Sequence, residues 1–167
     1  MSLPVEPRFL CDEMLGRLAR YLRFLGYDVE YRQGVRDEEL VRRSREDDRL
    51  LLTRDRTLAQ RTRRAVLLRS LAVEGQLREL SREVPDLDRG VRFLRCSLCN
   101  GPLYEADRST PRPPRGVPED RWGGPDPVYI CRSCGQAYWE GSHTREIRLT
   151  LARALGHEVS PGEGGSS

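Results

Sequence analysis

Three aspartates among the first 55 residues stand where carboxylates could act together. Asp12 and Asp55 each end a short apolar run, and Asp37 opens a charged, helix-like segment. Carboxylates that converge on one point repel each other unless a cation lies among them. Mg²⁺ or Mn²⁺ suits such oxygen ligands, and either ion can activate a water for attack on a phosphodiester. We therefore take Asp12, Asp37 and Asp55 as candidate catalytic metal ligands. Plainer alternatives are a helix N-cap for Asp37 and a turn residue for Asp55.

Four of the five cysteines form two CxxC pairs, Cys96/Cys99 and Cys131/Cys134. Two such turns can supply the four thiolates of a tetrahedral zinc site. The pairs are 31 residues apart, a longer separation than in compact zinc ribbons. We expect one structural zinc per chain, with no open position for catalysis, and consider redox chemistry at a CxxC pair the weaker alternative. The fifth cysteine, Cys11, reads as a buried strand thiol.

The spacing of apolar residues indicates which elements position the acids. Strands are expected over 8–12, 27–31, 49–55 and 65–69, and helices over 14–26, 37–47, 56–64 and 71–84. Alternation of this kind predicts an α/β fold, a mainly parallel sheet covered by helices on both faces. Ligands of such sheets bind beyond the carboxyl ends of the strands. Asp12 and Asp55 both lie at such ends.

The first expected helix has an apolar stripe at spacings of three and four residues. Gly26 follows it as a stop signal. On a regular helix, Arg17, Arg20 and Arg23 fall on the face opposite this stripe. We therefore expect all three to face solvent.

Every one of the 29 basic residues is arginine, and the net charge is +3. Guanidinium groups suit bidentate contacts with phosphate and stacking on bases. The densest group comprises Arg54, Arg56, Arg61, Arg63 and Arg64. This group is either a solvated helix face or a track for a phosphate backbone.

The amino-acid composition changes after Pro85, where Pro, Gly and turn residues become frequent. We expect one domain over 1–90, a small zinc-binding unit over 91–145, and a short helix with a flexible tail over 146–167. No apolar run approaches the roughly 20 residues that cross a bilayer, and the N-terminus lacks the pattern of a secretory signal. These features predict a cytoplasmic protein without membrane contact.

Several ordered motifs together resemble the Mut-seven C-terminal ribonuclease domain family. They are "FLCDEMLGRLARYLRFLGYDVEY", "DEEL", "LLLTRD" and the two CxxC pairs followed by "YWEGSH", between about residue 8 and residue 145. The resemblance implies a PIN-like three-layer domain followed by a zinc ribbon. It also implies metal-dependent cleavage of RNA, with Asp12 and Asp55 as metal ligands and Asp37 or Glu38 as a further acid. No fourth acid of the kind common in PIN-type sites stands out.

The resemblance also implies the residues that contact single-stranded RNA: Arg17, Arg20, Thr53, Arg54, His143 and Arg145. Thr53 and Arg54 would position a metal-bound water and a phosphate. Tyr138 and Trp139 could stack on bases, or instead pack the zinc ribbon against the first domain.

Two other functions fit part of this pattern of acids, cysteines and arginines. A phosphoacceptor receiver domain also carries acids after its first and third strands, but it needs a lysine that this chain lacks. A non-catalytic RNA-binding module would use zinc for shape and arginine for affinity. Carboxylates at the strand ends argue against it, because they repel phosphate unless a metal neutralises them.

Overall fold

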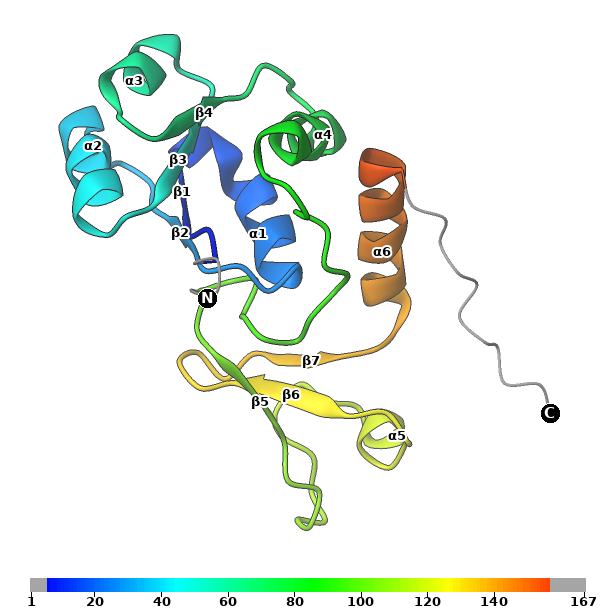
Figure 1. Cartoon of the computed structure of the whole chain (residues 1–167). Helices are drawn as coiled ribbons and strands as arrows, with labels where there is room; N and C mark the ends of the chain where they lie inside the picture. The colour runs from blue at the N-terminus through cyan, green and yellow to red at the C-terminus, as the bar shows by residue number, and fades with distance from the viewer. Residues whose placement is uncertain (1–5, 157–167) are drawn as a thin grey trace, which may run out of the picture.

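The computed structural model describes residues 6–156 of the chain. Its larger sheet has four parallel strands in the order β2-β1-β3-β4. The strands are β1 (Phe9–Cys11), β2 (Val29–Tyr31), β3 (Leu50–Thr53) and β4 (Ala65–Leu67). The accompanying helices are the 3₁₀ turn η1 (Glu13–Leu15), α1 (Gly16–Phe24), α2 (Asp37–Glu46), α3 (Arg56–Arg61) and α4 (Val73–Glu83). The predicted α/β fold with a mainly parallel sheet is confirmed (Figure 1).

Helices cover both faces of this sheet, because alternate strand residues point to opposite sides. Phe9 and Cys11 of β1 belong to the larger core, which α1 and α4 complete. Leu10, between them, belongs to a second core with Leu51 and residues of α2 and α3. The central strands β1 and β3 are thus buried on both faces, which explains their continuous apolar runs.

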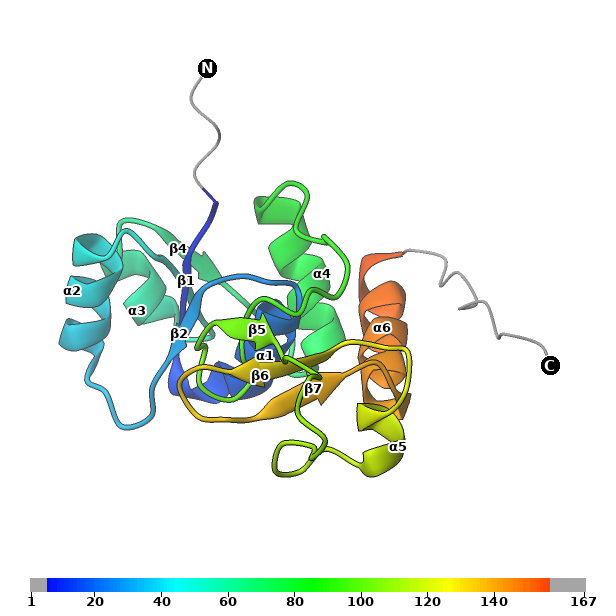
Figure 2. The same cartoon turned by 90° about the horizontal axis from the view of Figure 1, so that it is seen from below.

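A smaller antiparallel sheet follows, with β5 (Leu103–Glu105), β6 (Val128–Cys131) and β7 (Ala137–Trp139) in that order. Together with the short α5 (Glu119–Trp122) it surrounds its own apolar core, in which Trp122 packs with Val128. We call residues 91–141 the zinc unit. Figure 2 shows its sheet from below, crossing under α1.

The last helix, α6 (Ser142–Leu155), begins earlier than the expected start at residue 146. Its apolar side chains Ile147, Leu151 and Ala154 belong to the same core as α1 and α4. Figure 1 shows α6 beside α4. The zinc unit is therefore joined at both ends to the α/β core. The expected flexible tail lies outside the described residues, and none of the helices within 6–156 is long and apolar enough to cross a membrane.

Arg23 contradicts the expectation that all three arginines of α1 face solvent. Its side chain is only 4% exposed, and its Nε and Nη2 donate to the Val29 carbonyl at 3.1 and 2.8 Å. Its Nη1 donates to the carbonyls of Ser97 and Leu98, in the first CxxC turn, at 3.1 and 3.3 Å. Helical periodicity misplaced Arg23 because the zinc unit, distant in sequence, covers this part of the outer face. One guanidinium thus joins α1, β2 and the zinc unit.

A second polar contact holds the zinc unit against the edge strand β2. Asn100, in the left-handed conformation at φ 67°, accepts from the Val29 N–H at 3.0 Å and donates to Asp28 Oδ1 at 2.8 Å. Arg49 donates to the same carboxylate at 2.9 Å. Burial acts to raise the pKa of Asp28, but the hydrogen bonds from Arg49 and Asn100 outweigh it and hold the pKa at about 2. The zinc unit therefore protects a sheet edge that would otherwise be open.

We expect Arg23→Ala to lower the free energy of unfolding by about 3 kcal/mol, because three carbonyl groups lose their donors and a buried space opens. Arg20→Ala, one turn earlier on the exposed face of α1, is the matched control and should unfold close to the parent. Urea unfolding of the zinc-loaded proteins measures both. Equal midpoints for the two variants would contradict the role given to Arg23.

Candidate functional site

Asp12 and Asp55 meet at the carboxyl edge of the larger sheet through a single side chain, Thr53. Strands β1 and β3 are neighbours, and the Asp12 N–H donates to the Leu52 carbonyl at 3.1 Å. The Thr53 hydroxyl donates to Asp12 Oδ2 at 2.9 Å and accepts from the Asp55 N–H at 3.0 Å. Thr53 itself is fully buried. The motif "TRD" therefore fixes both acids from beneath.

Each of these two carboxylates keeps one oxygen without a protein partner among residues 6–156. Asp12 uses Oδ2 for Thr53. Asp55 uses Oδ1 to cap α3, accepting from the Leu58 N–H at 3.0 Å. The remaining oxygen of each is available to a cation. Mg²⁺ commonly binds through one or two carboxylates and keeps several waters, so this pair of acids fits it.

Asp37 stands apart from this pair. It is the first residue of α2, after the N-cap Arg36, and its side chain makes no cap hydrogen bond. The N-cap alternative for Asp37 is therefore wrong, whereas Asp55 does cap its helix. Within residues 6–156 the four cysteines are the only group of three or more His, Cys, Asp or Glu side chains close enough to hold one ion. Asp37 therefore does not complete a three-carboxylate cluster with Asp12 and Asp55.

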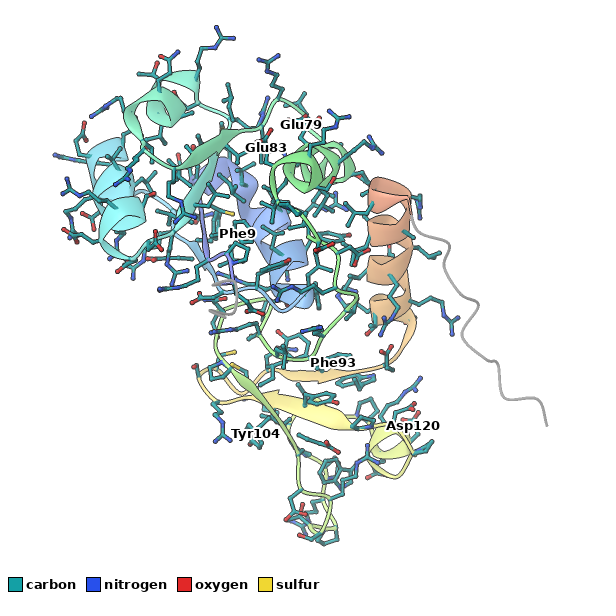
Figure 3. The ribbon with its side chains drawn as sticks, in the orientation of Figure 1. Phe9, Glu79, Glu83, Phe93, Tyr104 and Asp120 are labelled. Atoms are coloured by element: carbon teal, nitrogen blue, oxygen red, sulfur yellow. The ribbon has the colours of Figure 1, made fainter. Side chains whose placement is uncertain are left out.

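Glu79 was missed by the sequence analysis. This α4 residue accepts from the N–H groups of Arg69 and Ser70, at 2.7 and 2.9 Å, and from the Ser70 hydroxyl. Figure 3 labels Glu79 above α4, near the end of β4. Burial acts to raise its pKa, yet these donors hold the pKa below its usual value. Glu79 anchors the loop after the fourth strand, and a helical Glu twelve residues past the end of β4 gives no local signal of that role.

Arg54, in the middle of "TRD", carries an unusual donor. Its Nε is buried and has no hydrogen-bond acceptor among the described residues. Buried donors are rarely left unpaired in folded proteins. Because this nitrogen is covered by the protein, a phosphate bound at the surface would meet Arg54 through the outer guanidinium nitrogens instead.

The four cysteines have the geometry of a zinc site. Their sulfurs all lie within 4.8 Å of one another, with Cys96–Cys134 at 3.6 Å and Cys99–Cys131 at 3.5 Å. A tetrahedron with Zn–S bonds of 2.3 Å has sulfur–sulfur edges of about 3.8 Å. Gly101 permits this close approach, since a Cβ there would lie 2.9 Å from the Cys131 sulfur. The predicted four-cysteine metal site is confirmed as a cluster that fits zinc.

Backbone groups around Cys131 stabilise its thiolate. Burial acts to raise the pKa of Cys131, but the N–H groups of Cys134 and Ser133 point at its sulfur and lower the pKa to about 7. The Tyr138 hydroxyl lies 3.0 Å from the Cys96 sulfur and accepts from the Ser97 N–H at 3.0 Å. Tyr138 therefore supports the zinc site and the packing of the zinc unit. Of the two alternatives for this residue, base stacking and packing of the zinc ribbon, its contacts favour packing.

The remaining expected RNA contacts lie on the surface. Arg17 and Arg20 are exposed on α1, with Arg17 stacked 6.0 Å from the Tyr21 ring. His143 and Arg145 are exposed in the first turn of α6. Arg20 and His143 line one pocket of about 300 Å³. The fold thus brings together residues that are more than a hundred positions apart in the sequence.

The arginine cluster of "TRDRTLAQRTRR" divides between the two ends of α3. Arg54 and Arg56 lie at its start, whereas Arg61, Arg63 and Arg64 line a separate pocket of about 450 Å³ with Arg45. Two members of that second group are already ion-paired, Arg61 with Glu38 and Arg64 with Asp48. A solvated, paired surface therefore accounts for part of the cluster.

The model of the Mut7-C RNAse domain family matches residues 7–151. The chain belongs to this family. The match runs from the residues before β1 into α6, so it covers the α/β core and the zinc unit together. Searches of the curated proteins and of the solved structures found no match. Membership of the Mut7-C family agrees with the resemblance seen in the motifs and favours a ribonuclease over a receiver domain.

We predict one tightly bound zinc per chain in protein purified without chelators. Cys96→Ser and Cys131→Ser replace the two buried ligands, and each should lose the zinc and much of the unfolding free energy, because the zinc unit is fixed around the ion. Elemental analysis and thermal unfolding measure these effects. Cys11→Ser is the control for metal content, since Cys11 lies in β1 outside the cluster. Freshly purified parent protein without zinc would contradict the assignment.

Proposed function

We propose that this protein is a ribonuclease that depends on Mg²⁺ or Mn²⁺ held by Asp12 and Asp55. The family indicates the ribonuclease role in general terms, and the geometry of these two acids supports the metal dependence. The observation that carries the proposal is the hydroxyl of Thr53, which fixes both acids at the sheet edge with an oxygen of each left available. A divalent ion bound there would activate a water and stabilise the leaving oxygen of a phosphodiester.

The chain's own residues have distinct parts in this proposal. Asp12 and Asp55 would hold the cation that orients the scissile phosphodiester, and Asp55 is itself held by capping α3. Thr53 is buried, so it positions the acids and does not touch RNA. Arg54, partly exposed beside these acids, would meet a phosphate oxygen through the outer nitrogens of its guanidinium. Asp37, at the start of α2, would act as an accessory acid and not as a direct ligand.

A non-catalytic RNA-binding module is the second candidate. The exposed arginines of α1 and the zinc unit favour binding, and they would serve it without any metal at the acids. The two candidates differ in one respect: only the ribonuclease needs the carboxylates. Cleavage that depends on Asp12 and Asp55 decides between them.

Asp12→Asn and Asp55→Asn should each reduce cleavage of a labelled single-stranded RNA, in Mg²⁺ or Mn²⁺, by about a hundredfold or more. Both variants should fold, because Asn can accept from Thr53 and is a good N-cap. Asp37→Asn should have the smaller effect. Asp120→Asn, on α5 (Figure 3), is the distant control. Undiminished cleavage by the Asp12 and Asp55 variants would reject this site.

Thr53→Val keeps the shape of the side chain and removes both hydrogen bonds of its hydroxyl. We expect kcat to fall about tenfold or more, with a higher metal concentration needed for half-maximal rate, because the acids lose their common support. Thr53→Ser should restore most of both parameters. A Val variant with the parent's metal dependence would show that the hydroxyl has no positioning role.

A further inference from the structure

Two pockets adjoin along the outer face of α1. One, of about 430 Å³, is lined by Gly16, Arg17, Arg20, Arg23, Tyr31, Ser97 and Leu98. The other, of about 300 Å³, shares Arg20, Ser97 and Leu98 with it and continues past Trp139 to the first turn of α6. Since three lining residues are common to both, the two pockets form one groove between α1 and the zinc unit. We call it the α1 groove.

The α1 groove begins close to the candidate acids. Gly16 and Tyr31 line its first end. The Tyr31 hydroxyl donates to the carbonyl of Glu13 at 2.8 Å, and Glu13 directly follows Asp12 in the chain. The other end lies at Gly141–Thr144, where α6 starts. A strand bound at Asp12 could therefore continue into the groove without crossing the protein.

The lining of the α1 groove combines cations with apolar surface. No acidic residue lines either pocket. Arg17 and Arg20 are exposed, and no carboxylate within residues 6–156 pairs with them. Leu98 is 53% exposed at the groove although it is apolar, and Trp139 adds an aromatic surface. Unpaired guanidinium groups attract phosphates, and apolar or aromatic side chains stack on bases.

We propose that the α1 groove holds an unpaired segment of the RNA strand adjoining the cleaved bond. This inference rests on the proposed ribonuclease function and names its substrate as single-stranded. In a duplex the base faces are covered by stacking and pairing, whereas an unpaired strand can turn its bases onto Leu98 and Trp139 while Arg17 and Arg20 meet its phosphates. The zinc unit thereby forms one wall of the substrate path.

Both walls of the α1 groove are anchored, so its width is fixed, and a fixed width is needed if the groove is to distinguish an unpaired strand from a duplex. Arg23 lies in its floor and ties the Ser97 and Leu98 carbonyls to β2, as described above. On the other side, Tyr138 packs edge-on against Phe24 of α1, with ring centroids 6.5 Å apart. Binding therefore needs little rearrangement of either wall.

Binding of a fluorescent single-stranded oligoribonucleotide of about ten nucleotides tests the groove directly. The protein is the full, zinc-loaded chain carrying Asp12→Asn and Asp55→Asn, so that RNA stays intact. Adding Arg20→Glu should weaken binding about tenfold or more, and Leu98→Ala by a smaller factor. Arg45→Glu, on α2, makes the same charge change at an exposed arginine without an ion pair and should bind like its parent. A duplex of the same sequence should compete poorly.

The outcomes separate the groove from the proposed chemistry. Equal losses for Arg20→Glu and Arg45→Glu would reduce the effect to net charge and overturn the groove, as would an absence of RNA binding or equal competition by the duplex. Suppose that only Arg20→Glu weakens binding and that the protein with both aspartates intact cleaves no RNA. This result would uphold the groove and contradict the ribonuclease. Suppose instead that the protein with both aspartates intact cleaves RNA, while Arg20→Glu leaves RNA binding unchanged. This result would uphold the ribonuclease and overturn the groove.

Discussion

The hydroxyl of Thr53 is the interaction on which the candidate site depends. A hydroxyl has one proton to donate, and here it goes to Asp12 while the oxygen accepts from the Asp55 backbone. This is possible only because β1 and β3 are adjacent and parallel, so that their carboxyl ends coincide. Two like charges held close together repel each other, and a divalent cation between them would remove that cost. The adjacent strand β1, which Asp12 directly follows, thus accounts for a second carboxylate at the end of β3.

The zinc unit has its own small sheet, but it is anchored to the α/β core at both of its ends. It is inserted between α4 and α6, and α6 returns to the core that α1 and α4 build. Arg23 and Asn100 then fix the first CxxC turn against β2. Because both ends and the turn are anchored, the long excursion between the CxxC pairs does not loosen the metal cluster. A zinc ion bound by the four cysteines would hold that turn, and hence one wall of the α1 groove, in place.

Much of the fold could be predicted from local sequence. Continuous apolar runs gave β1 and β3, and the two CxxC pairs gave the sulfur cluster, because each pattern is fixed within a few residues. The burial of Arg23 could not be predicted in this way, since the CxxC turn that covers it lies more than seventy residues away. The same holds for Glu79, whose role depends on a loop that folds back to α4. Arg36, one residue before Asp37, is the N-cap of α2, and Asp55 caps α3, because N-cap residue types alone do not mark a helix start to within one residue.

The most direct test of the account is anomalous X-ray diffraction from crystals of the zinc-loaded protein soaked in Mn²⁺. The four cysteines supply an internal control, because a zinc peak must appear among them. The account predicts a manganese peak between the free carboxylate oxygens of Asp12 and Asp55, absent from Asp12→Asn crystals. A clear zinc peak with no manganese at these two acids would contradict the central claim that they hold the catalytic ion.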